Sequence, residues 1–322
     1  MKVLLIRFSS LGDVILVSSV LPALKEKGIE VDLLTFKPFG ELFKGHPFLN
    51  KVIEVERKDL KTLKGIKALS EELQGYDSAF DLHDTLRTKI LRRYLNFPVF
   101  TYKKKSFLRR LMVIFKPFKA KGLFVPELYA EVFRNIGVEI KKPRPYLKVD
   151  EVALKKLKSK LGESKNLIAV APGARWESKT YPLGKFKEIV KNLRKLGFTP
   201  VIVGGKEERS KGEILKREDA VNFCGELSLK ESLALISICR GVVSNDSAVV
   251  HMARAVKIPV VSIFGPTHPS FGFAPYPDEG KALTLNLPCS PCSLHGKTKC
   301  KNRKCFEIPP ERVVEELLAV IK

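Results

Sequence analysis

Short apolar runs alternate with amphipathic stretches along the whole chain, which predicts a repeated strand–helix pattern. In the first half, the runs typical of buried strands are Val3–Phe8, Glu30–Thr35, Lys51–Val55 and Ser78–Leu82. In the second half they are Leu167–Ala171, Thr199–Val203, Ala220–Phe223, Gly241–Ser244 and Val260–Phe264. Because these runs are short and nearly continuous, we expect parallel strands with helices on both faces.

Apolar residues at helical spacing predict the helices between these strands. In the first half they are Asp13–Lys27, Lys61–Leu73, Arg87–Tyr94, Leu108–Phe115 and Glu127–Ile136. In the second half they are Leu183–Leu196, Glu208–Lys216, Leu229–Cys239, Ala248–Val256 and Pro310–Ile321.

Residues 141–150 contain two prolines, which favour extended backbone and interrupt any helix, so this segment is the predicted linker. The fold class is therefore α/β, with two Rossmann-like doubly wound domains over residues 1–145 and 146–322. The last helix, 310–321, belongs to the second domain or packs back on the first. Two such domains place a ligand cleft at the carboxyl ends of their strands.

The 322 residues carry a formal net charge of +23, which indicates an anionic partner such as nucleic acid, an acidic membrane surface or a phosphorylated substrate. The segment Thr85–Pro126 has no acidic residue, and apolar side chains interleave its basic ones. The basic residues are Arg87, Lys89, Arg92, Arg93, Lys103, Lys104, Lys105, Arg109, Arg110, Lys116, Lys119 and Lys121. This pattern suits an anionic bilayer face, and a solvated basic surface is the alternative.

The apolar runs are too short for a spanning helix, and the chain begins with a strand-like run in place of a secretion signal. We therefore expect a cytoplasmic protein.

The first candidate site follows the first predicted strand. Gly12 permits a tight turn, Ser9 and Ser10 offer hydroxyls beside a helix N-terminus, and Asp13 lies at the mouth of the predicted cleft. Serine and aspartate are also common helix N-caps, so a purely structural role is the alternative.

The second and third candidate sites follow strands of the second half. Lys179 lies in the polar loop 172–182, where it either neutralises a phosphate or is one more solvated lysine. Asp246 and Ser247 end another strand at a helix N-terminus, an arrangement that binds anions, and His251 lies one turn on. Simple capping and a buried core histidine are the alternatives here. A further strand ends in GPTHP, residues 265–269.

Several known motifs are absent from the sequence. It contains no D-x-D, no phosphate-binding G-x-x-x-x-G-K-[ST] loop, no G-x-S-x-G and no G-x-G-x-x-G. A diphosphate leaving group would then be stabilised by helix N-termini, hydroxyls and lysine without a metal.

Four of the six cysteines lie close together, at Cys289, Cys292, Cys300 and Cys305. Four thiolates in such a short segment could enclose a structural zinc ion. Disulfides or free thiols are the alternatives, and disulfides are uncommon in cytosolic proteins.

The ordered combination of these segments resembles the ADP-heptose:lipopolysaccharide heptosyltransferases, glycosyltransferase family nine. RFSSLGD resembles the R-x-S-x-G-D loop of that family, and SKTYP its K-x-W-P loop, with Tyr181 where tryptophan is usual. NDSAVVHMA and GPTHP are similar to its D-[TS]-G-x-x-H and GPT elements, with Ala248 in place of glycine. DLHDTLRT resembles its D-L-Q-x-x-x-R-S stretch, and the cysteine-rich tail resembles that of the second heptosyltransferases.

The resemblance implies the glycosyltransferase-B fold and inverting, metal-independent transfer of heptose from ADP-heptose to the lipopolysaccharide inner core. Asp13 would be the catalytic base. The implied donor-binding residues are Lys179, Asp246, Ser247, Ala248, Val249 and His251, in the second domain. The implied acceptor-binding residues are Ser9, Ser10, Gly12 and Arg87, in the first domain.

The implied partners are the donor, a phosphorylated lipopolysaccharide acceptor and the anionic inner face of the inner membrane, to which the basic segment would dock.

A family member that uses another nucleotide sugar is one alternative. From other classes, a nucleic-acid-binding protein would need a helix-turn-helix, a stacking sheet or a zinc finger, none of which the sequence contains. A nucleotide-sugar-binding protein without activity is the remaining alternative.

Overall fold

The computed structural model describes residues 1–116, 123–162 and 165–321. They form two compact units, which we describe separately. Unit 1 comprises residues 1–104 and 125–148, and unit 2 comprises 105–124 and 149–322. The sequence predicted that segment 105–124 belongs to the first domain. Its described residues, 105–116 and 123–124, instead belong to unit 2. Lys119 and Lys121 of the predicted basic segment lie outside the described residues.

Unit 1 is built on a parallel sheet of five strands in the order β3-β2-β1-β4-β5. The strands are β1 Lys2–Ile6, β2 Glu30–Phe36, β3 Lys51–Val55, β4 Ser78–Asp81 and β5 Val99–Thr101. Four were predicted within two residues at each end. The edge strand β5 was missed because it has only three half-buried residues and hence no long apolar run.

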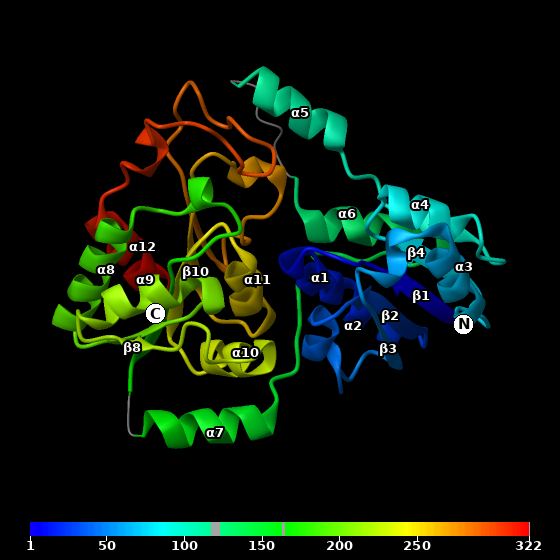
Figure 1. The fold of residues 1–322 in the computed structure, drawn as a ribbon, viewed down its shortest axis with the longest axis horizontal. Coiled ribbons are helices and arrows are strands. Elements are labelled where there is room, and N and C mark those ends of the chain that lie inside the picture. The colour runs from blue at the N-terminus through cyan, green and yellow to red at the C-terminus, as the bar shows by residue number, and fades with distance from the viewer. Residues whose placement is uncertain (117–122, 163–164, 322) are drawn as a thin grey trace. The chain divides into compact units, whose positions relative to one another are not determined.

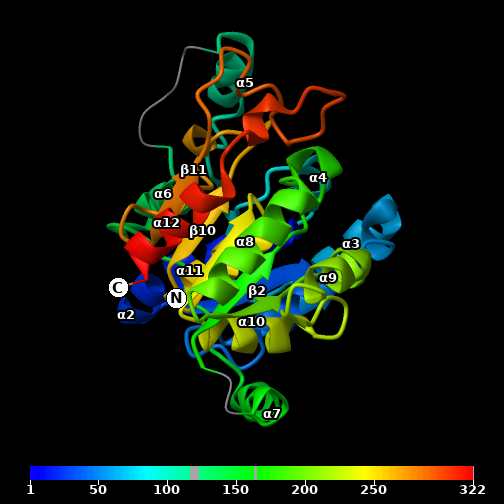
Figure 2. The same cartoon turned by 90° about the vertical axis from the view of Figure 1, so that its left-hand side faces the viewer.

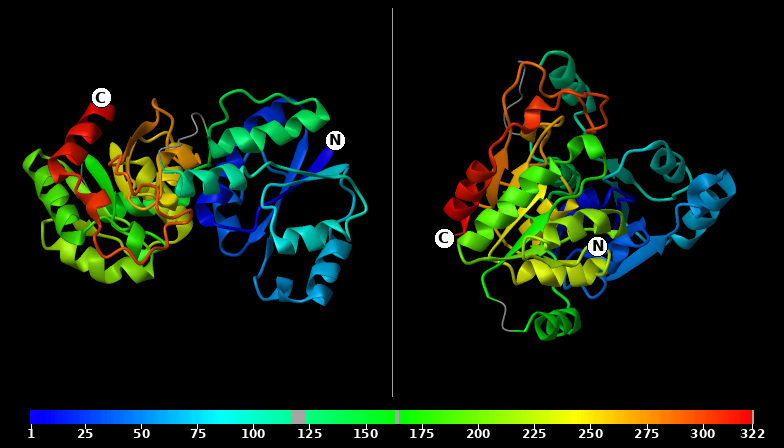
Figure 3. Two further views of the ribbon diagram at one scale, coloured as in Figure 1. Left: turned by 90° about the horizontal axis from the view of Figure 1, so that it is seen from above. Right: turned by 60° about the vertical axis from the view of Figure 1, so that its left-hand side comes forward.

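Helices cover both faces of this sheet (Figure 3). The α-helices of unit 1 are α1 Leu11–Val17, α2 Leu21–Glu26, α3 Leu63–Glu72, α4 Leu86–Arg92 and α6 Val125–Glu131. The 3₁₀ turns are η1 Ser18–Val20, η2 Phe39–Phe43, η3 Asp59–Lys61 and η4 Val132–Ile136. Helix α3 packs Ile66 and Leu69 on the sheet, with Leu73 directly after it, while α1 lies beside α6.

The single helix predicted over residues 13–27 is divided into α1, η1 and α2. The hydroxyls of Ser18 and Ser19 donate to the carbonyls of Ile15 and Leu16, at 2.6 and 2.7 Å. Serine side chains that bond to nearby carbonyls compete with the helical ladder, and Pro22 adds a residue without an N–H.

Unit 2 is built on a parallel sheet of six strands in the order β11-β10-β9-β6-β7-β8. They are β6 Leu167–Ala171, β7 Thr199–Ile202, β8 Val221–Asn222, β9 Gly241–Asn245, β10 Val260–Ile263 and β11 Gly280–Leu283. The edge strand β11 was not predicted. It lacks a continuous apolar run, because its first residue is a glycine, at φ +154°, and its second is an exposed lysine.

Helices of unit 2 cover both faces of the second sheet, and α7 packs on α10 outside these layers. The α-helices are α5 Ser106–Ile114, α7 Glu151–Leu161, α8 Leu183–Lys195, α9 Arg209–Lys216, α10 Leu229–Ser237, α11 Ala248–Ala255 and α12 Pro310–Val320. The 3₁₀ turns are η5 Glu177–Lys179, η6 Lys206–Glu208, η7 Pro269–Phe271 and η8 Lys304–Phe306. Figure 2 shows α8, α9 and α12 in front of the sheet, and α11 with α10 lies on the other face.

Helix α12 belongs to the core of unit 2, where Val313 and Leu317 are fully buried. Gly241 at the start of β9 admits this helix, because a Cβ there would lie 2.9 Å from Leu317 Cδ1 and 2.6 Å from Ile321 Cγ2. The sequence left open whether this helix packs on the first domain.

Helix α7 was not predicted, although it follows the predicted linker directly (Figure 1). It begins at an N-cap, Asp150, whose carboxylate accepts from the Ala153 N–H at 3.0 Å. Only Ala153 and Leu157 are buried, so the helix lacks the apolar stripe on which the prediction depended.

Candidate active site

In unit 1 the turn after β1 leads into α1, which carries Asp13 in its first turn. Ser10 is the N-cap of α1 and Asp13 the third helical residue, and together they form a capping box. One carboxylate oxygen of Asp13 accepts from the Ser10 hydroxyl at 2.6 Å and from the Ser10 N–H at 3.2 Å. Asp13 therefore takes part in helix capping, and it also keeps part of its side chain open to solvent.

The other carboxylate oxygen of Asp13 lies 2.8 Å from the guanidinium of Arg7, a buried residue directly after β1. Arg7 also donates to the Leu82 carbonyl, and its guanidinium lies over the Tyr129 ring. Burial alone would lower the pKa of Arg7, but attraction to Asp13 and to the two tyrosines Tyr102 and Tyr129 raises it above its ordinary value. Arg7 belongs to the RFSSLGD motif, but its position in the sequence did not predict this contact with Asp13.

His83 and Lys104 are two further groups near this carboxylate that sequence reasoning missed. Burial lowers the pKa of His83 to about 3, and repulsion by Arg7 and Lys104 contributes. Burial and repulsion by Arg7 also lower the pKa of Lys104, whose ammonium donates to the Asp84 carbonyl at 2.7 Å. Arg87 of α4 is exposed, and Ser9 is half-buried beside Ser10. The site thus combines the Asp13 carboxylate with the positive charges of Arg7 and Lys104, and the carboxylates of Asp81 and Asp84 also act on Lys104.

In unit 2 the loops after β6 and β9 bring Lys179 and Asp246 together. The Lys179 ammonium lies 2.5 Å from the Asp246 carboxylate, and each side chain is 14% exposed. The Thr267 hydroxyl, from the loop after β10, donates to the same carboxylate at 2.8 Å. Three predicted strand-end loops therefore meet at one place.

Helix α11 begins beside this ion pair. Ser247 is its N-cap and accepts from the Val249 N–H at 3.3 Å, while the Ser244 and Ser247 hydroxyls lie 3.0 Å apart. The N-terminus of α11, including Ala248, presents N–H groups and the positive end of the helix dipole, both of which favour an anion. His251 is buried one turn on, with its ring 6.3 Å from that of Phe273.

Asn245, the last residue of β9, connects two of these loops. Its amide N–H₂ donates to the Gly173 carbonyl at 3.1 Å, and its amide oxygen accepts from the Tyr181 N–H at 2.8 Å. Tyr181 is fully buried, and its hydroxyl donates to the Ile308 carbonyl at 2.5 Å. Asn245 was quoted only as part of a motif, and this positioning role has no local signal because its two partners are distant in sequence.

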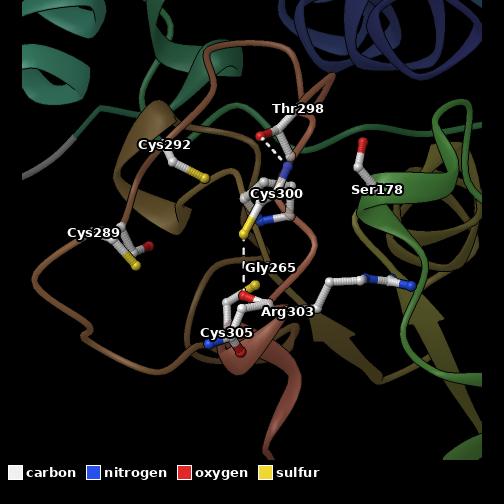
Figure 4. A pocket seen from close by; sticks show the side chains of 11 residues that line it. Ser178, Gly265, Cys289, Cys292, Thr298, Cys300, Arg303 and Cys305 are labelled. Carbon is white, nitrogen blue, oxygen red and sulfur yellow. Dashed lines mark hydrogen bonds between the residues drawn. The ribbon is translucent and has the colours of Figure 1, made fainter.

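The four clustered cysteines line one small cavity of about 30 Å³, together with Ser178 of η5 and Gly265 and Pro266 after β10 (Figure 4). Burial raises the pKa of Cys305 to about 11, with further contributions from Cys292, Cys300 and Cys289. All four are free thiols. Over the residues that the structure describes, no three potential metal ligands converge on one point, so the predicted zinc site is not preformed.

No helix among the described residues is long and apolar enough to span a bilayer.

Comparison with known sequences gives a consistent family match. The sequence model of glycosyltransferase family 9 (heptosyltransferase) matches residues 64–303. Lipopolysaccharide heptosyltransferase 1 of Campylobacter coli is 26% identical over 84% of this chain and 85% of that protein. Lipooligosaccharide heptosyltransferase 2 of Campylobacter jejuni (serotype O:2) is 26% identical over 97% of this chain and 96% of that protein.

Solved structures share the fold. The family 9 glycosyltransferase of Veillonella parvula superposes with a TM-score of 0.81 at 18% identity, covering 99% of this chain and 97% of that one. The ADP-heptose lipopolysaccharide heptosyltransferase II of Escherichia coli gives 0.76 at 22% identity, covering 100% and 98%. The predicted fold class, two Rossmann-like doubly wound units of the glycosyltransferase-B architecture, is confirmed.

Proposed function

The chain belongs to glycosyltransferase family 9, and on that premise we propose that it transfers L-glycero-D-manno-heptose from ADP-heptose to the lipopolysaccharide inner core. The observation that carries this proposal is the Lys179–Asp246 pair at the start of α11, which offers an ammonium, a carboxylate and helix N–H groups to one ligand. An Escherichia coli heptosyltransferase of the same fold was solved with ADP-2-deoxy-2-fluoro heptose, at 18% identity and a TM-score of 0.72.

Asp13 is the catalytic base in this proposal. Its carboxylate accepts the proton of the acceptor hydroxyl as that oxygen attacks the anomeric carbon of the donor. The attack comes from the side opposite the leaving ADP, so a single displacement inverts the configuration of that carbon. Arg7 and Ser10 hold the carboxylate in place, so that little reorganisation is needed at the moment of reaction.

The donor diphosphate is bound by Lys179, the Ser247 hydroxyl and the N–H groups of Ala248 and Val249. The Val249 N–H donates to the Ser247 hydroxyl, so this hydroxyl rotates away when a phosphate oxygen binds, while the N–H keeps the direction that the helix gives it. Asp246 accepts hydrogen bonds from sugar hydroxyls, and His251 supports the loop from within α11. The negative charge that develops on ADP is offset by the lysine and the helix dipole, with no role for a metal ion.

The acceptor is a phosphorylated, anionic sugar. Ser9, Ser10 and Gly12 border the Asp13 turn, and the exposed Arg87 on α4 is a contact for an acceptor phosphate. His83 is neutral above about pH 4 because of its lowered pKa, so the local positive charge comes from Arg7, Lys104 and Arg87.

We also propose that the protein works in the cytoplasm, docked on the inner face of the inner membrane through α5. The exposed side of this helix carries Phe107, 75% exposed, and Ile114, 67% exposed, with Arg110 between them. Residues 107, 110 and 114 follow helical spacing, so they lie on one side of α5. Apolar side chains flanked by basic ones suit an anionic lipid surface.

The four-cysteine cavity is our candidate for a structural zinc site. Its lining includes four thiols and no carboxylate, a donor set that zinc prefers. Since no three ligands converge in the described residues, the loop 289–305 would have to close around the ion. The ion would stabilise this loop and take no part in the transfer.

The decisive test is Asp13→Asn, assayed with ADP-heptose and an inner-core acceptor. We expect kcat to fall by about 10²- to 10⁴-fold, the range of general-base catalysis, while ADP still binds. Glu26→Gln, which removes an exposed carboxylate on α2, is the matched control and should keep full activity. Normal turnover in Asp13→Asn refutes the base assignment.

A second test compares donors. Preference for a UDP- or GDP-sugar over ADP-heptose would indicate a family member with another donor.

A further inference from the structure

The loop of residues 289–306, which we call the cysteine loop, contacts the turn η5 that carries Lys179. The Ser178 hydroxyl donates to the Gly296 carbonyl at 2.6 Å. Gly296 has φ +91°, and a Cβ at this position would lie 2.2 Å from Cδ of Lys179. The methylene stem of Lys179 thus passes directly over Gly296, through space that any other side chain would fill.

Arg303 holds the same turn from a second direction. Its guanidinium donates to the Thr180 carbonyl and, at 3.4 Å, to the Glu177 carbonyl. These two carbonyls lie on either side of Lys179 in the chain. In Figure 4 the Arg303 side chain extends away from the cysteines toward the segment that carries Ser178. The backbone around Lys179 is therefore fixed on both sides by one side chain.

The cysteine loop is also attached to the loop that follows β10. The N–H groups of Cys292 and Ser293 donate to the Pro266 carbonyl at 3.0 and 3.1 Å. The next residue, Thr267, donates its hydroxyl to Asp246, the partner of Lys179. One loop thus supports both members of the Lys179–Asp246 pair.

We propose that Gly296 and Arg303 are positioning residues for the donor diphosphate: they fix the stem and backbone of Lys179 so that its ammonium points at the phosphates. A lysine ammonium sits on a flexible four-carbon stem and loses rotamer freedom when it binds a ligand. When the stem of Lys179 is already confined in the free protein, binding costs less rotamer entropy, so the affinity for ADP is higher. This inference rests on the proposed role of Lys179 in binding ADP.

The first test compares Gly296→Ala with Gly197→Ala. Both glycines have positive φ, at +91° and +79°, but a Cβ at Gly197 meets nothing within 4 Å. The Gly197 variant therefore controls for backbone strain without displacing Lys179. We expect Gly296→Ala to weaken ADP binding about tenfold by calorimetry, a change of about 1.4 kcal/mol, and Gly197→Ala to leave it unchanged. Adenosine, which has no phosphate, should bind both variants as it binds the unaltered protein.

The second test compares Arg303→Gln with Lys304→Gln, a neighbouring exposed position with the same charge change. Arg303→Gln should weaken ADP but not adenosine, and Lys304→Gln should change neither. Arg303→Lys keeps a cationic donor for one carbonyl, so we expect it to recover part of the ADP affinity.

Two results would overturn the inference. The first is unchanged ADP affinity in both Gly296→Ala and Arg303→Gln, while the unaltered protein binds ADP. The second is an equal loss of ADP and adenosine binding, which would mean that these residues only keep unit 2 folded. If the unaltered protein binds no ADP at all, the proposed donor is wrong, and the inference fails with it.

Discussion

The guanidinium of Arg7 lies 2.8 Å from the carboxylate of Asp13, and both side chains are largely shielded from water. The two residues lie on either side of the turn between β1 and α1, Arg7 directly after β1 and Asp13 in the first turn of α1. The arginine is itself fixed by the Leu82 carbonyl and by two tyrosines. The orientation of the carboxylate that we propose as the base is thus set by a buried arginine.

Replacing Arg7 by Gln should reduce kcat by about 10- to 100-fold, the equivalent of one lost charge-assisted hydrogen bond of about 1.5–3 kcal/mol. ADP affinity should stay the same, because the donor loops belong to unit 2. Steady-state kinetics and calorimetry measure the two effects. Arg57→Gln, at an exposed arginine of the same unit, serves as the control, and unaltered kcat in Arg7→Gln would refute the positioning role.

Asp246→Asn should strengthen the binding of ADP by about threefold to tenfold, because it frees the Lys179 ammonium from a carboxylate 2.5 Å away. The same change should weaken the preference for ADP-heptose over ADP, since the sugar loses a hydrogen-bond acceptor. Lys179→Ala should weaken both ligands. Calorimetric titration with each ligand separates these outcomes, and weaker ADP binding in Asp246→Asn would contradict the competition between carboxylate and phosphate.

The free energy of unfolding should fall as the pH drops from about 6.5 toward 3, in part because of His83. Its folded pKa of about 3 lies below the ordinary value of 6.5, so over this interval the unfolded chain binds a proton that the folded chain does not. The slope from this residue is at most about 1.4 kcal/mol per pH unit. Urea unfolding at several pH values measures this dependence, and the free energy of unfolding of His83→Gln should fall less steeply toward acid pH. Equal slopes in the two proteins would mean that His83 titrates normally.

Membrane docking through α5 predicts sedimentation with vesicles that contain phosphatidylglycerol, and little with pure phosphatidylcholine. The double change Phe107→Ser and Ile114→Ser should reduce partitioning at least tenfold, since each buried apolar side chain contributes about 1.5–3 kcal/mol. Leu196→Ser, at a leucine that is 52% exposed beside α8, is the control. Added salt should weaken the residual binding. Equal sedimentation of the double variant would place the contact elsewhere.

Elemental analysis of protein purified without chelators should find about one zinc ion per chain if the four thiols bind one. Chelation should then lower the unfolding temperature, and Cys289→Ser with Cys305→Ser should remove both the metal and the effect of the chelator. If the purified protein contains no metal and added zinc does not change its unfolding temperature, the four cysteines are free thiols and the zinc proposal is wrong.

The sequence predicted the parts that follow from local pattern. The central strands, the Asp13 turn and the loops of Lys179 and Asp246 were all predicted from apolar runs followed by polar residues, and the family resemblance specified their roles. Arg7 was missed because a buried arginine inside a strand run has no local signal; its partners Leu82 and Tyr129 come from other elements. The contact of Gly296 with Lys179 joins residues more than 100 positions apart. Such contacts depend on tertiary packing, which periodicity does not encode.

Strands β1 and β9 are each hydrogen-bonded on both sides, β1 to β2 and β4, and β9 to β6 and β10. Asp13 and Asp246 follow these two strands, so both carboxylates are anchored to the best-protected backbone of their sheets. Amide protons of β1 and β9 should exchange with deuterated solvent only through global opening of each unit, whereas the loops beyond them exchange on their own. The loops can then change conformation in each catalytic cycle, while the strands that carry them keep the same register.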